Sequence, residues 1–339
     1  MMIDFKNLNL NQLLSENEFE KKVKSFLEHW LSDEKTVLVQ TSGSTGIPKI
    51  FEIEKSKMMN SAEMTCNFLG LKEGDTALLC LPVEYISGKM MVVRSVIKNL
   101  ILNVTEPSLR PLQNVDHEID FCAMTPLQVE NSLDELHWIK NIIIGGAAVS
   151  ESLKNKIFNT LGSKGSQRIF ETYGMSETLS HIALKQIYPV SEVFFTAFEN
   201  VDISTDERGC LRICAPQLNA EVLQTNDLVE IKNNNQFRFL GRIDNVINSG
   251  GAKIFPEQLE ALVKKEIPNE VVFTGREDER LGQKLILVIE GQKSQGIIDK
   301  IVAIPFEKSF HRPKEIIFIE KIPRTPNGKI DRIALKNIQ

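Results

Sequence analysis

Two periodicities follow one another in the first forty residues of the chain. Apolar side chains spaced by three or four positions predict one helix, and they are Phe19, Val23, Phe26, Leu27, Trp30 and Leu31. The β-branched run that follows, Thr36 to Gln40, predicts a strand. A segment rich in glycine and hydroxyl side chains comes directly after it, so the expected order is helix, strand and loop.

Short apolar runs and longer helical segments then alternate along the chain. The apolar runs, which predict strands, are 77–81, 119–124, 142–144 and 168–171. Segments with helical spacing lie between some of them, for example 57–69 and 89–100. Such alternation packs helices against a sheet whose strands are partly parallel, so it predicts an α/β fold.

The pattern changes twice in the second half of the chain. From about Val193 it consists of short strand-like pieces without a long helix, which predicts a β-rich lobe. Further on, Ser249-Gly250-Gly251 precedes a helix that begins near Pro256, a favourable residue for a first turn. The remainder predicts strands at 270–274, 284–290 and 315–319, with a helix before the third. We therefore predict a large N-terminal domain, residues 1–242, that carries the lobe, and a small α+β C-terminal domain, residues 243–339.

Composition and charge narrow the class of protein. Of the 339 residues, 42% are hydrophobic and 25% are charged, as in ordinary water-soluble proteins. Forty basic residues stand against forty-five acidic ones without a block of like charge, which argues against a general nucleic-acid partner. No apolar run approaches the roughly 18 residues of a membrane span, and no signal-peptide pattern opens the chain, so we expect a cytoplasmic protein. Cys210 and Cys214 lack a second Cys or His pair, so we expect no zinc site.

The loop after the first predicted strand is the first candidate for chemistry. It reads Thr41-Ser42-Gly43-Ser44-Thr45-Gly46-Ile47-Pro48-Lys49 and gathers four hydroxyls, two glycines and a lysine. Backbone N–H groups and hydroxyls of such a loop can surround phosphate oxygens, while Lys49 supplies a positive charge. Its spacing is not that of a Walker A loop. The alternative is an ordinary flexible surface loop.

A second candidate follows the predicted strand 168–171. It reads Tyr173-Gly174-Met175-Ser176-Glu177, and ligands of open α/β sheets bind at the carboxyl ends of strands. The carboxylate of Glu177 could hold Mg²⁺ there. The alternative is that Ser176 and Glu177 cap a following helix.

Two more motifs lie near and beyond the predicted domain boundary. Gly241-Arg242-Ile243-Asp244 comes shortly before the double glycine, which suits a hinge between domains or an ordinary linker. Near the C-terminus, Pro323-Arg324-Thr325-Pro326-Asn327-Gly328-Lys329 should form a turn that presents Lys329. As an isolated feature, such a lysine is usually a solvated charge.

The four motifs together resemble those of the adenylate-forming superfamily, which contains acyl-CoA synthetases, peptide-synthetase adenylation domains and luciferases. Their order, and their approximate spacing after the loop, agree with that superfamily, and the resemblance extends over residues 36–332. It implies a large domain that holds ATP and a carboxylic acid, and a mobile C-terminal domain that supplies a lysine. It also implies Mg²⁺ as cofactor, with ATP and CoA as co-substrates.

The resemblance assigns roles by position. Lys49 and Lys329 would be catalytic, Glu177 would bind Mg²⁺, and Asp244 would be the hinge. The ATP-binding residues would be Thr41, Ser42, Gly43, Ser44, Thr45, Gly46, Gly145, Gly146, Ala147, Tyr173, Gly174, Ser176, Asp227 and Arg242.

Within that superfamily the chain is most similar to the o-succinylbenzoate–CoA ligases of menaquinone biosynthesis. The segment 81–94 resembles their acid-binding segment, and 174–181 resembles their version of the second motif. The resemblance makes Tyr85, Ser87, Arg94 and Ser180 acid-binding residues, with Arg94 facing a second carboxylate of the substrate. A guanidinium on an otherwise apolar helix is costly unless an anion pairs with it. The alternative is an ion pair with an acidic side chain of the protein.

Three departures from the superfamily pattern stand out. Only forty residues precede Thr41, so we expect a reduced N-terminal subdomain, an exposed apolar face and a possible homodimer. The usual Thr-Gly-Asp has become Thr225-Asn226-Asp227, and asparagine tolerates backbone geometry that glycine permits. Tyr85 stands where many relatives have histidine or another aromatic residue, so the gate between acid pocket and CoA channel is expected to differ.

The resemblance implies a two-step ligation through an acyl-adenylate. The expected reaction converts o-succinylbenzoate, ATP and CoA into o-succinylbenzoyl-CoA, AMP and pyrophosphate. Three alternatives remain at this point: another aryl- or acyl-CoA ligase, an adenylation module that loads a carrier protein, and a catalytically silent nucleotide-binding protein.

Overall fold

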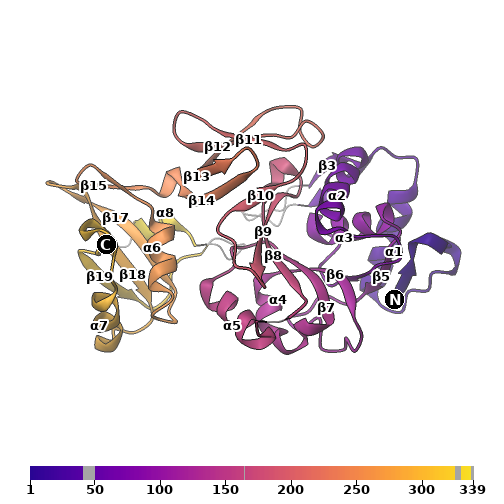
Figure 1. Cartoon of the computed structure of the whole chain (residues 1–339), viewed down its shortest axis with the longest axis horizontal. Helices are drawn as coiled ribbons and strands as arrows, with labels where there is room; N and C mark the ends of the chain where they lie inside the picture. The colour runs from indigo at the N-terminus through magenta and orange to yellow at the C-terminus, as the bar shows by residue number, and fades with distance from the viewer. Residues whose placement is uncertain (41–49, 164, 325–329, 337–339) are drawn as a thin grey trace.

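The computed structural model describes residues 1–40, 50–163, 165–324 and 330–336 (Figure 1). The whole predicted phosphate loop, residues 41–49, lies outside these ranges, and with it Thr41, Ser42, Gly43, Ser44, Thr45, Gly46 and Lys49; Lys329 lies outside them too. Two large sheets and one two-stranded ribbon organise the described residues. The C-terminal sheet lies at one end of the long axis, and helices α1 to α3 lie towards the other (Figure 1).

The larger sheet has twelve strands and confirms the predicted α/β fold. Its parallel part runs β5-β4-β6-β7-β8, as the alternation of strands and helices predicts. These strands are β4 (Thr76–Leu79), β5 (Ile101–Val104), β6 (Ile119–Met124), β7 (Ile139–Ile144) and β8 (Arg168–Gly174). The antiparallel strand β1 (Met2–Asp4) pairs with β5 at one edge.

The remaining strands of this sheet are antiparallel and form the β-rich lobe predicted from about Val193. They continue from β8 in the order β9-β10-β14-β13-β12-β11. Their bounds are β9 (His181–Tyr188), β10 (Phe195–Ala197), β11 (Asp202–Thr205), β12 (Cys210–Cys214), β13 (Leu223–Asn233) and β14 (Gln236–Arg242). The lobe therefore extends the sheet beyond β8 instead of forming a separate sheet.

Helices cover both faces of the parallel strands. They are α1 (Glu18–Leu31), α2 (Lys55–Leu69), α3 (Ile86–Ile97), α4 (Pro126–Asn131) and α5 (Glu151–Leu161). Ala77 of β4 packs in the core with α1, α2 and α3, whereas its neighbour Leu78 packs in a second core with α4 and α5. Successive side chains of a strand point to opposite faces, so a continuous apolar run serves both cores.

The first predicted helix and strand are both present, with two corrections. Leu31, expected on the buried face of α1, is 46% exposed because it is the last residue of the helix. The strand at Thr36 to Gln40 is β2 (Thr36–Gln40), but it pairs with β3 (Ile50–Glu54) in a separate two-stranded ribbon. Gln40 and Ile50, the described residues on either side of positions 41–49, are partners in that ribbon.

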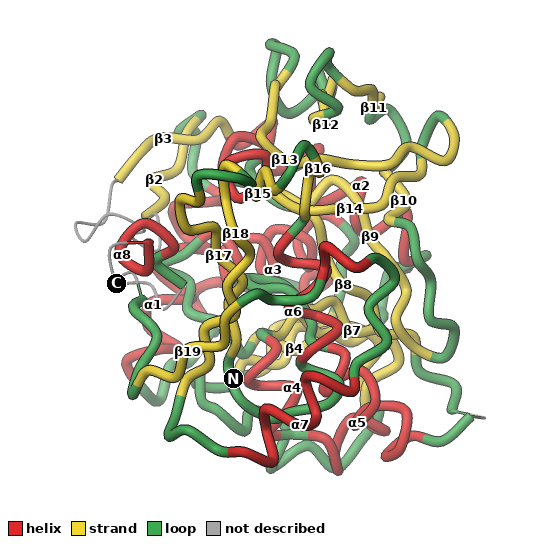
Figure 2. The backbone as a smooth tube through the Cα atoms, turned by 90° about the vertical axis from the view of Figure 1, so that its left-hand side faces the viewer, coloured by secondary structure: helices red, strands yellow, loops and turns green. Residues whose placement is uncertain are grey.

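The second sheet begins after β14 and has the order β16-β15-β18-β17, with β19 beside β18 (Figure 2). Its strands are β15 (Ile247–Ser249), β16 (Ala252–Ile254), β17 (Val271–Asp278), β18 (Gly282–Glu290) and β19 (Glu315–Ile319). Its helices are α6 (Pro256–Val263), α7 (Gln295–Ala303) and α8 (Arg332–Lys336). The helix expected near Pro256 and the three predicted strands are confirmed, while β15, β16 and α8 are additional.

A buried ion pair attaches α8 to this sheet. The Arg332 guanidinium donates to both oxygens of Glu260, at 2.9 and 2.6 Å, and to the carbonyl of Phe273. Burial raises the pKa of Glu260, and the Arg332 charge opposes that shift. Removing Arg332 would leave the Glu260 carboxylate buried without its counter-ion, so the pair fixes the segment that follows residues 325–329.

Candidate active site

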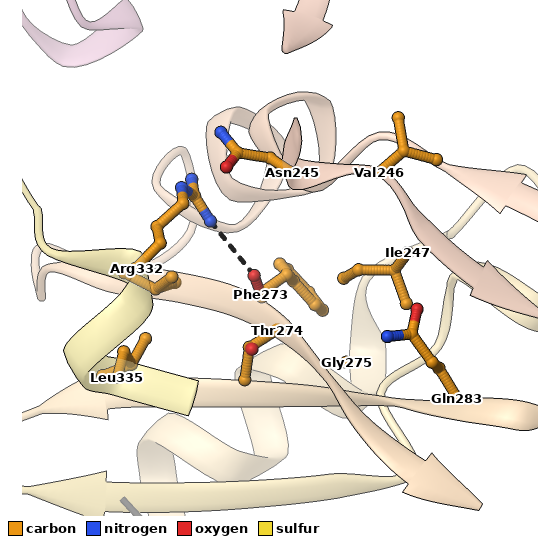
Figure 3. Close-up of a pocket in the computed structure, with 10 residues that line it drawn as sticks. Asn245, Val246, Ile247, Phe273, Thr274, Gly275, Gln283, Arg332 and Leu335 are labelled. Atoms are coloured by element: carbon orange, nitrogen blue, oxygen red, sulfur yellow. Dashed lines mark hydrogen bonds between the residues drawn. The ribbon is translucent and has the colours of Figure 1, made fainter. Parts of the chain in front are cut away.

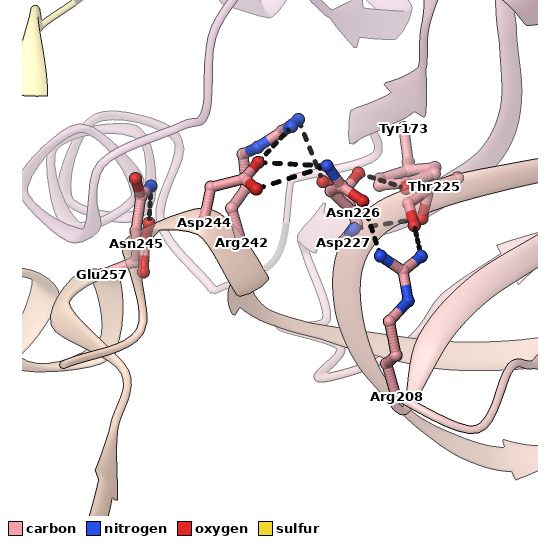
Figure 4. A network of polar contacts seen from close by, with 9 residues as sticks. All are labelled: Tyr173, Arg208, Thr225, Asn226, Asp227, Arg242, Asp244, Asn245 and Glu257. Carbon is pink, nitrogen blue, oxygen red and sulfur yellow. Dashed lines mark hydrogen bonds and ion pairs between the residues drawn. The ribbon is translucent and has the colours of Figure 1, made fainter. Parts of the chain in front are cut away.

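Tyr173, Asp227 and Arg242 meet where three strands of the large sheet end or begin (Figure 4). Tyr173 lies near the end of β8, while Asp227 on β13 and Arg242 on β14 are paired residues of neighbouring strands. The Tyr173 hydroxyl donates to Asp227 Oδ2 over 2.6 Å, and Arg242 Nη1 lies 3.4 Å from Asp227 Oδ1. The structure thus brings together three residues that the sequence assigned to ATP.

Aromatic packing fixes the Tyr173 ring. Phe195 and Phe237 lie 5.7 and 4.9 Å from it, centroid to centroid. Burial, followed by the charge of Asp227, raises the pKa of the Tyr173 phenol, so the group remains a hydrogen-bond donor at neutral pH. The Asp227 carboxylate faces the Tyr173 hydroxyl and the Arg242 guanidinium.

Gly145, Gly146 and Ala147 follow the carboxyl end of β7, the strand beside β8. Gly146 and Ala147 are exposed. A Cβ at Gly145 would lie 2.9 Å from Thr172 Oγ1, so glycine allows this loop to approach β8 closely. The loop therefore borders β8, the strand that carries Tyr173.

Ser176 and Glu177 lie in one short 3-10 turn, Ser176–Thr178, between β8 and β9. The alternative that they cap a following helix is wrong, because the strand β9 follows the turn. Both residues are exposed. Tyr173 and Gly174, expected after the strand, are instead its last residues.

The chemistry of this turn fits Mg²⁺. Within the described ranges no ion pair involves the Glu177 carboxylate, so it is available as an oxygen ligand. No cluster of three or more His, Cys, Asp or Glu side chains suited to a metal occurs among the described residues. A single carboxylate is sufficient for Mg²⁺ when substrate phosphates and waters complete the coordination. Glu177 would hold the ion in that way.

Arg94 is a buried cation on α3. Its side chain is 2% exposed, and its Nη2 donates to Ser180 Oγ over 3.2 Å. Its Nε has no hydrogen-bond partner. Burial lowers the pKa of Arg94 to about 10, which still leaves it charged at neutral pH. The alternative of a structural ion pair finds no support, because no described acidic side chain forms one with Arg94.

A chain of hydrogen bonds continues from Ser180 into the protein. His181 Nδ1 lies 3.3 Å from Ser180 Oγ, and His181 Nε2 lies 3.1 Å from Thr65 Oγ1. The Thr65 hydroxyl donates to the carbonyl of Ser61, so it accepts from Nε2–H of His181. Nδ1 is then the acceptor for the Ser180 hydroxyl, which leaves the Ser180 oxygen free to accept from Arg94. Burial, followed by the Arg94 charge, lowers the pKa of His181 well below its usual value, so the ring is neutral.

Backbone geometry aims Ser180 at Arg94. Leu179 has φ +66° and ψ −47°, and the Ser180 N–H donates to the Thr178 carbonyl over 2.7 Å. These values describe a γ-turn with a left-handed central residue, a rare and strained conformation. A Cβ at Gly174 would lie 2.4 Å from the Cα of His181, so only glycine permits this crossing. Strain of this kind persists where surrounding structure determines it, and it clusters at ligand sites.

The other two acid-binding candidates lie at the start of α3. Tyr85 precedes the helix and forms a parallel bridge with Gln40, the last residue before the loop segment 41–49. Ser87 is exposed in the first turn. A Cβ at Gly88 would lie 2.3 Å from the Pro82 carbonyl oxygen, so α3 packs directly on backbone there. The start of α3 and Gln40 therefore lie side by side.

Asp244 lies in the segment that connects β14 of the large sheet with β15 of the small one. Arg242 Nη2 donates to its Oδ2 over 3.0 Å, and Asn226 Nδ2 lies 3.3 and 3.2 Å from its two oxygens. On the other side of the connection, Asn245 donates to Glu257 of α6. The candidate hinge residue is thus hydrogen-bonded to the large sheet, and its neighbour Asn245 is hydrogen-bonded to helix α6 (Figure 4).

A small cavity lies beneath this connection (Figure 3). Asn245 and Ile247 border it from the connecting side, and Phe273, Arg332 and Leu335 border it from the small sheet and α8. Its volume of about 20 Å³ accommodates one water molecule and excludes a nucleotide. It is therefore a packing defect under the hinge and not the ATP site.

Sequence reasoning missed Thr65, His181, Asn226 and Arg208 as members of these networks. His181 and Asn226 stand within quoted motifs, so their polar side chains next to Ser180 and Asp227 were the available signal. Thr65 and Arg208 come from distant segments, α2 and the turn between β11 and β12, and only the fold brings them close to the site.

Among the described helices, none combines the length and the hydropathy that a membrane span needs.

Comparisons with known proteins agree with this architecture. A model of the AMP-binding enzyme family matches residues 1–208. The crystal structure of an acyl-CoA synthetase (AMP-forming)/AMP-acid ligase II-like protein from Dyadobacter fermentans DSM 18053 is 36% identical, with a TM-score of 0.66. That alignment covers 96% of this chain and 95% of the other.

Two further relatives have named substrates. The 2-succinylbenzoate–CoA ligase of Lactococcus lactis is 25% identical over 98% of this chain and 81% of its own length. The o-succinylbenzoate coenzyme A synthetase of Bacillus subtilis, solved with ATP and magnesium ion, is 22% identical with a TM-score of 0.71. That alignment covers 88% of this chain and 69% of the other, and the likeness shows a shared fold.

Proposed function

The chain belongs to the AMP-binding enzyme family and is an AMP-forming acyl-CoA synthetase, and we propose that its acid substrate is o-succinylbenzoate. The reaction joins one carboxylate of the acid to CoA at the expense of ATP, which becomes AMP and pyrophosphate. The second carboxylate of the acid distinguishes this substrate from benzoate or a fatty acid.

Arg94 is the observation that carries the proposal. Its guanidinium is buried on α3, and its described contacts are with Ser180 and the sulfur of Met91, which are both uncharged. A buried cation without a counter-ion is unfavourable, whereas pairing with a carboxylate offsets much of that cost. A dicarboxylic acid supplies the missing anion, while a monocarboxylic acid uses its only carboxylate for the reaction. The ligase from Lactococcus lactis named above supports the same substrate.

The first step is attack of a substrate carboxylate oxygen on the α-phosphorus of ATP. The bond to the β-phosphate breaks, pyrophosphate leaves, and an acyl-adenylate remains. Two like unit charges about 4 Å apart repel by roughly 4 kcal/mol at an effective dielectric of 20, so cations must offset the approach. Lys49 and Lys329 are proposed to do so, and Glu177 would hold the Mg²⁺ that screens the phosphates. Positioning and charge stabilisation are sufficient, because the attacking carboxylate is already ionised.

The second step is attack of the CoA sulfur on the acyl carbon. The bond to AMP breaks, a thioester forms, and the thiol proton passes to solvent. We propose that residues 1–242 and 243–339 are the two domains, and that turning about Asp244 removes Lys329 from the adenylate before CoA enters. Tyr173, Asp227 and Arg242 would hold the adenosine throughout, with Gly145, Gly146 and Ala147 on the other face of the base.

Pyrophosphate and AMP release with ATP, Mg²⁺ and CoA tests the proposal. We expect turnover with o-succinylbenzoate, and at least 10²-fold lower kcat/KM with benzoate and with a fatty acid, because neither fills the Arg94 site. Equal turnover of benzoate would leave the assignment as an acyl-CoA synthetase intact and would reject o-succinylbenzoate as the specific substrate. Turnover only with a phosphopantetheinylated carrier protein, and not with CoA, would reject CoA as the acceptor.

A further inference from the structure

Asn226 connects the nucleotide-binding strands to the hinge. Its Nδ2 lies 3.3 Å from Oδ1 and 3.2 Å from Oδ2 of Asp244, eighteen residues further along the chain (Figure 4). Its Oδ1 accepts from Arg208 Nη1 over 3.1 Å. Since a guanidinium can only donate, this contact fixes the side-chain amide with its oxygen toward Arg208 and its NH₂ toward Asp244.

Arg208 is itself held in place. Its Nε donates to Asp206 Oδ2 over 2.8 Å, and its Nη2 donates to the carbonyl of Thr225 over 3.0 Å. The turn between β11 and β12 thus orients Asn226, and the Asn226 side chain donates to the Asp244 carboxylate. Arg242 contacts the same carboxylate from β14, so two donors of the large sheet meet at the hinge residue.

The backbone does not explain an asparagine at this position. The expectation was that Asn226 replaces a glycine because it tolerates glycine-like geometry. The described non-glycine residues with positive φ are Asn99, Leu179 and Asn200, and Asn226 is not among them. The side chain, and not the backbone, is what this position uses.

We propose that Asn226 is a positioning residue that latches Asp244 to the nucleotide-binding strands and holds the two domains in the arrangement of Figure 1. The proposal rests on the proposed function only in that a hinge at Asp244 serves the two half-reactions. The bonds lie at the surface, where the Asp244 side chain is 53% exposed, so the latch is weak enough to open in each cycle. A latch of this strength shifts the ratio of arrangements by about three- to tenfold.

Single-molecule FRET on the full chain measures that ratio directly. Fluorophores on cysteines introduced at exposed Asn131 in α4 and Lys300 in α7 report the distance between the domains. A Cys214→Ser background removes the one native thiol that is not buried. The comparison needs no substrate, so it reads the latch even if the acid has been misassigned.

Asn226→Gly removes the latch, and Asn226→Asp places a carboxylate against Asp244. Arg208→Ala leaves the amide but frees its orientation. We expect the ratio of the latched arrangement to all other arrangements to fall by about three- to tenfold in Asn226→Gly. The fall should be larger in Asn226→Asp and smaller in Arg208→Ala. Asn233→Gly, at the other end of β13, is the matched control and should leave the ratio unchanged.

The half-reactions give a second readout, namely the rate of adenylate formation against the rate of its conversion by CoA. The latch predicts that Asn226→Gly changes the ratio of these rates, while simple destabilisation would lower both together. An unchanged FRET distribution in both Asn226 variants would overturn the proposal. A shifted distribution in a protein that is inactive with o-succinylbenzoate would support the latch and reject the substrate.

Discussion

Arg94 and Ser180, which are 86 residues apart in the sequence, are joined by a hydrogen bond of 3.2 Å that is partly buried. The bond links α3 to the strained turn before β9, and the Ser180 hydroxyl takes its direction from neutral His181. Arg94 keeps an unpaired Nε after this contact. The protein therefore has a buried, oriented guanidinium whose charge no described side chain neutralises, and the proposed dicarboxylic substrate rests on it.

Tyr173→Phe removes the hydroxyl that Asp227 accepts from while retaining the aromatic ring. A hydrogen bond to a charged group is worth about 1.5–3 kcal/mol, part of which water recovers at this half-buried site. We expect the KM for ATP to rise about three- to tenfold with kcat nearly unchanged. Tyr188→Phe is the control, because that hydroxyl donates to the Gly162 carbonyl outside the site. An unchanged KM in Tyr173→Phe would remove the Tyr173–Asp227 contact from nucleotide binding.

Gly88→Ala forces a Cβ to within 2.3 Å of the Pro82 carbonyl oxygen. Backbone must move to relieve the clash, so we expect a loss of about 1–3 kcal/mol in the free energy of unfolding. Urea denaturation measures it. Gly296→Ala in α7 provides the control, since its nearest atom would lie 3.9 Å away, and we expect a gain of about 0.5–1 kcal/mol there. Equal effects of the two changes would contradict the close packing of α3.

His181 makes stability depend on pH in a definite direction. Its pKa is lowered in the folded protein, so below about pH 6.5 the unfolded chain binds the proton more readily than the folded one. Stability is therefore complete above that pH and falls as the pH drops towards the folded pKa, by up to about 1.4 kcal/mol per pH unit. His181→Gln should flatten this slope, and His117→Gln, at the surface, should not. Parallel slopes in wild type and His181→Gln would show that His181 is not the cause.

Lys329→Ala tests the lysine that only the sequence identifies. The loss of one preorganised cation typically lowers the rate by about 10²–10³-fold, so we expect adenylation to slow by that factor while ATP still binds. Isotope exchange between pyrophosphate and ATP measures the step. Lys321→Ala, at an exposed site outside the loop, is the matched control. Wild-type exchange in Lys329→Ala would remove this residue from its proposed role.

The fold followed from the sequence wherever a periodicity was long. Strands such as Ile119–Met124 and helices such as α2 were predicted within a few residues, because buried strands and amphipathic helices have distinct apolar spacing. The pairing of β2 with β3 was not predicted, since an isolated ribbon and a sheet strand have the same local pattern. The continuation of the sheet from β8 through the β-rich lobe is equally a property of tertiary pairing.

Motifs in the sequence name some residues of the candidate site, whereas other contacts depend on the tertiary fold. Tyr173, Asp227 and Arg242 were assigned by resemblance, and they meet in space. The path from Arg94 through Ser180 and His181 to Thr65 depends on α2, α3 and β9 packing together, which no local pattern encodes. The orientation of Asn226 depends likewise on Arg208 from another turn.

The assignment of Arg94 to the second carboxylate is tested most directly by assaying wild type and Arg94→Ala, each with the same two acids. The acids are o-succinylbenzoate and 4-oxo-4-phenylbutanoate, which lacks the carboxylate on the ring. We expect wild type to prefer o-succinylbenzoate by about 10²-fold or more in kcat/KM, and Arg94→Ala to lose most of that preference by slowing only with the dicarboxylate. Equal losses with both acids, or a preference that survives in Arg94→Ala, would contradict the assignment of Arg94 to the second carboxylate.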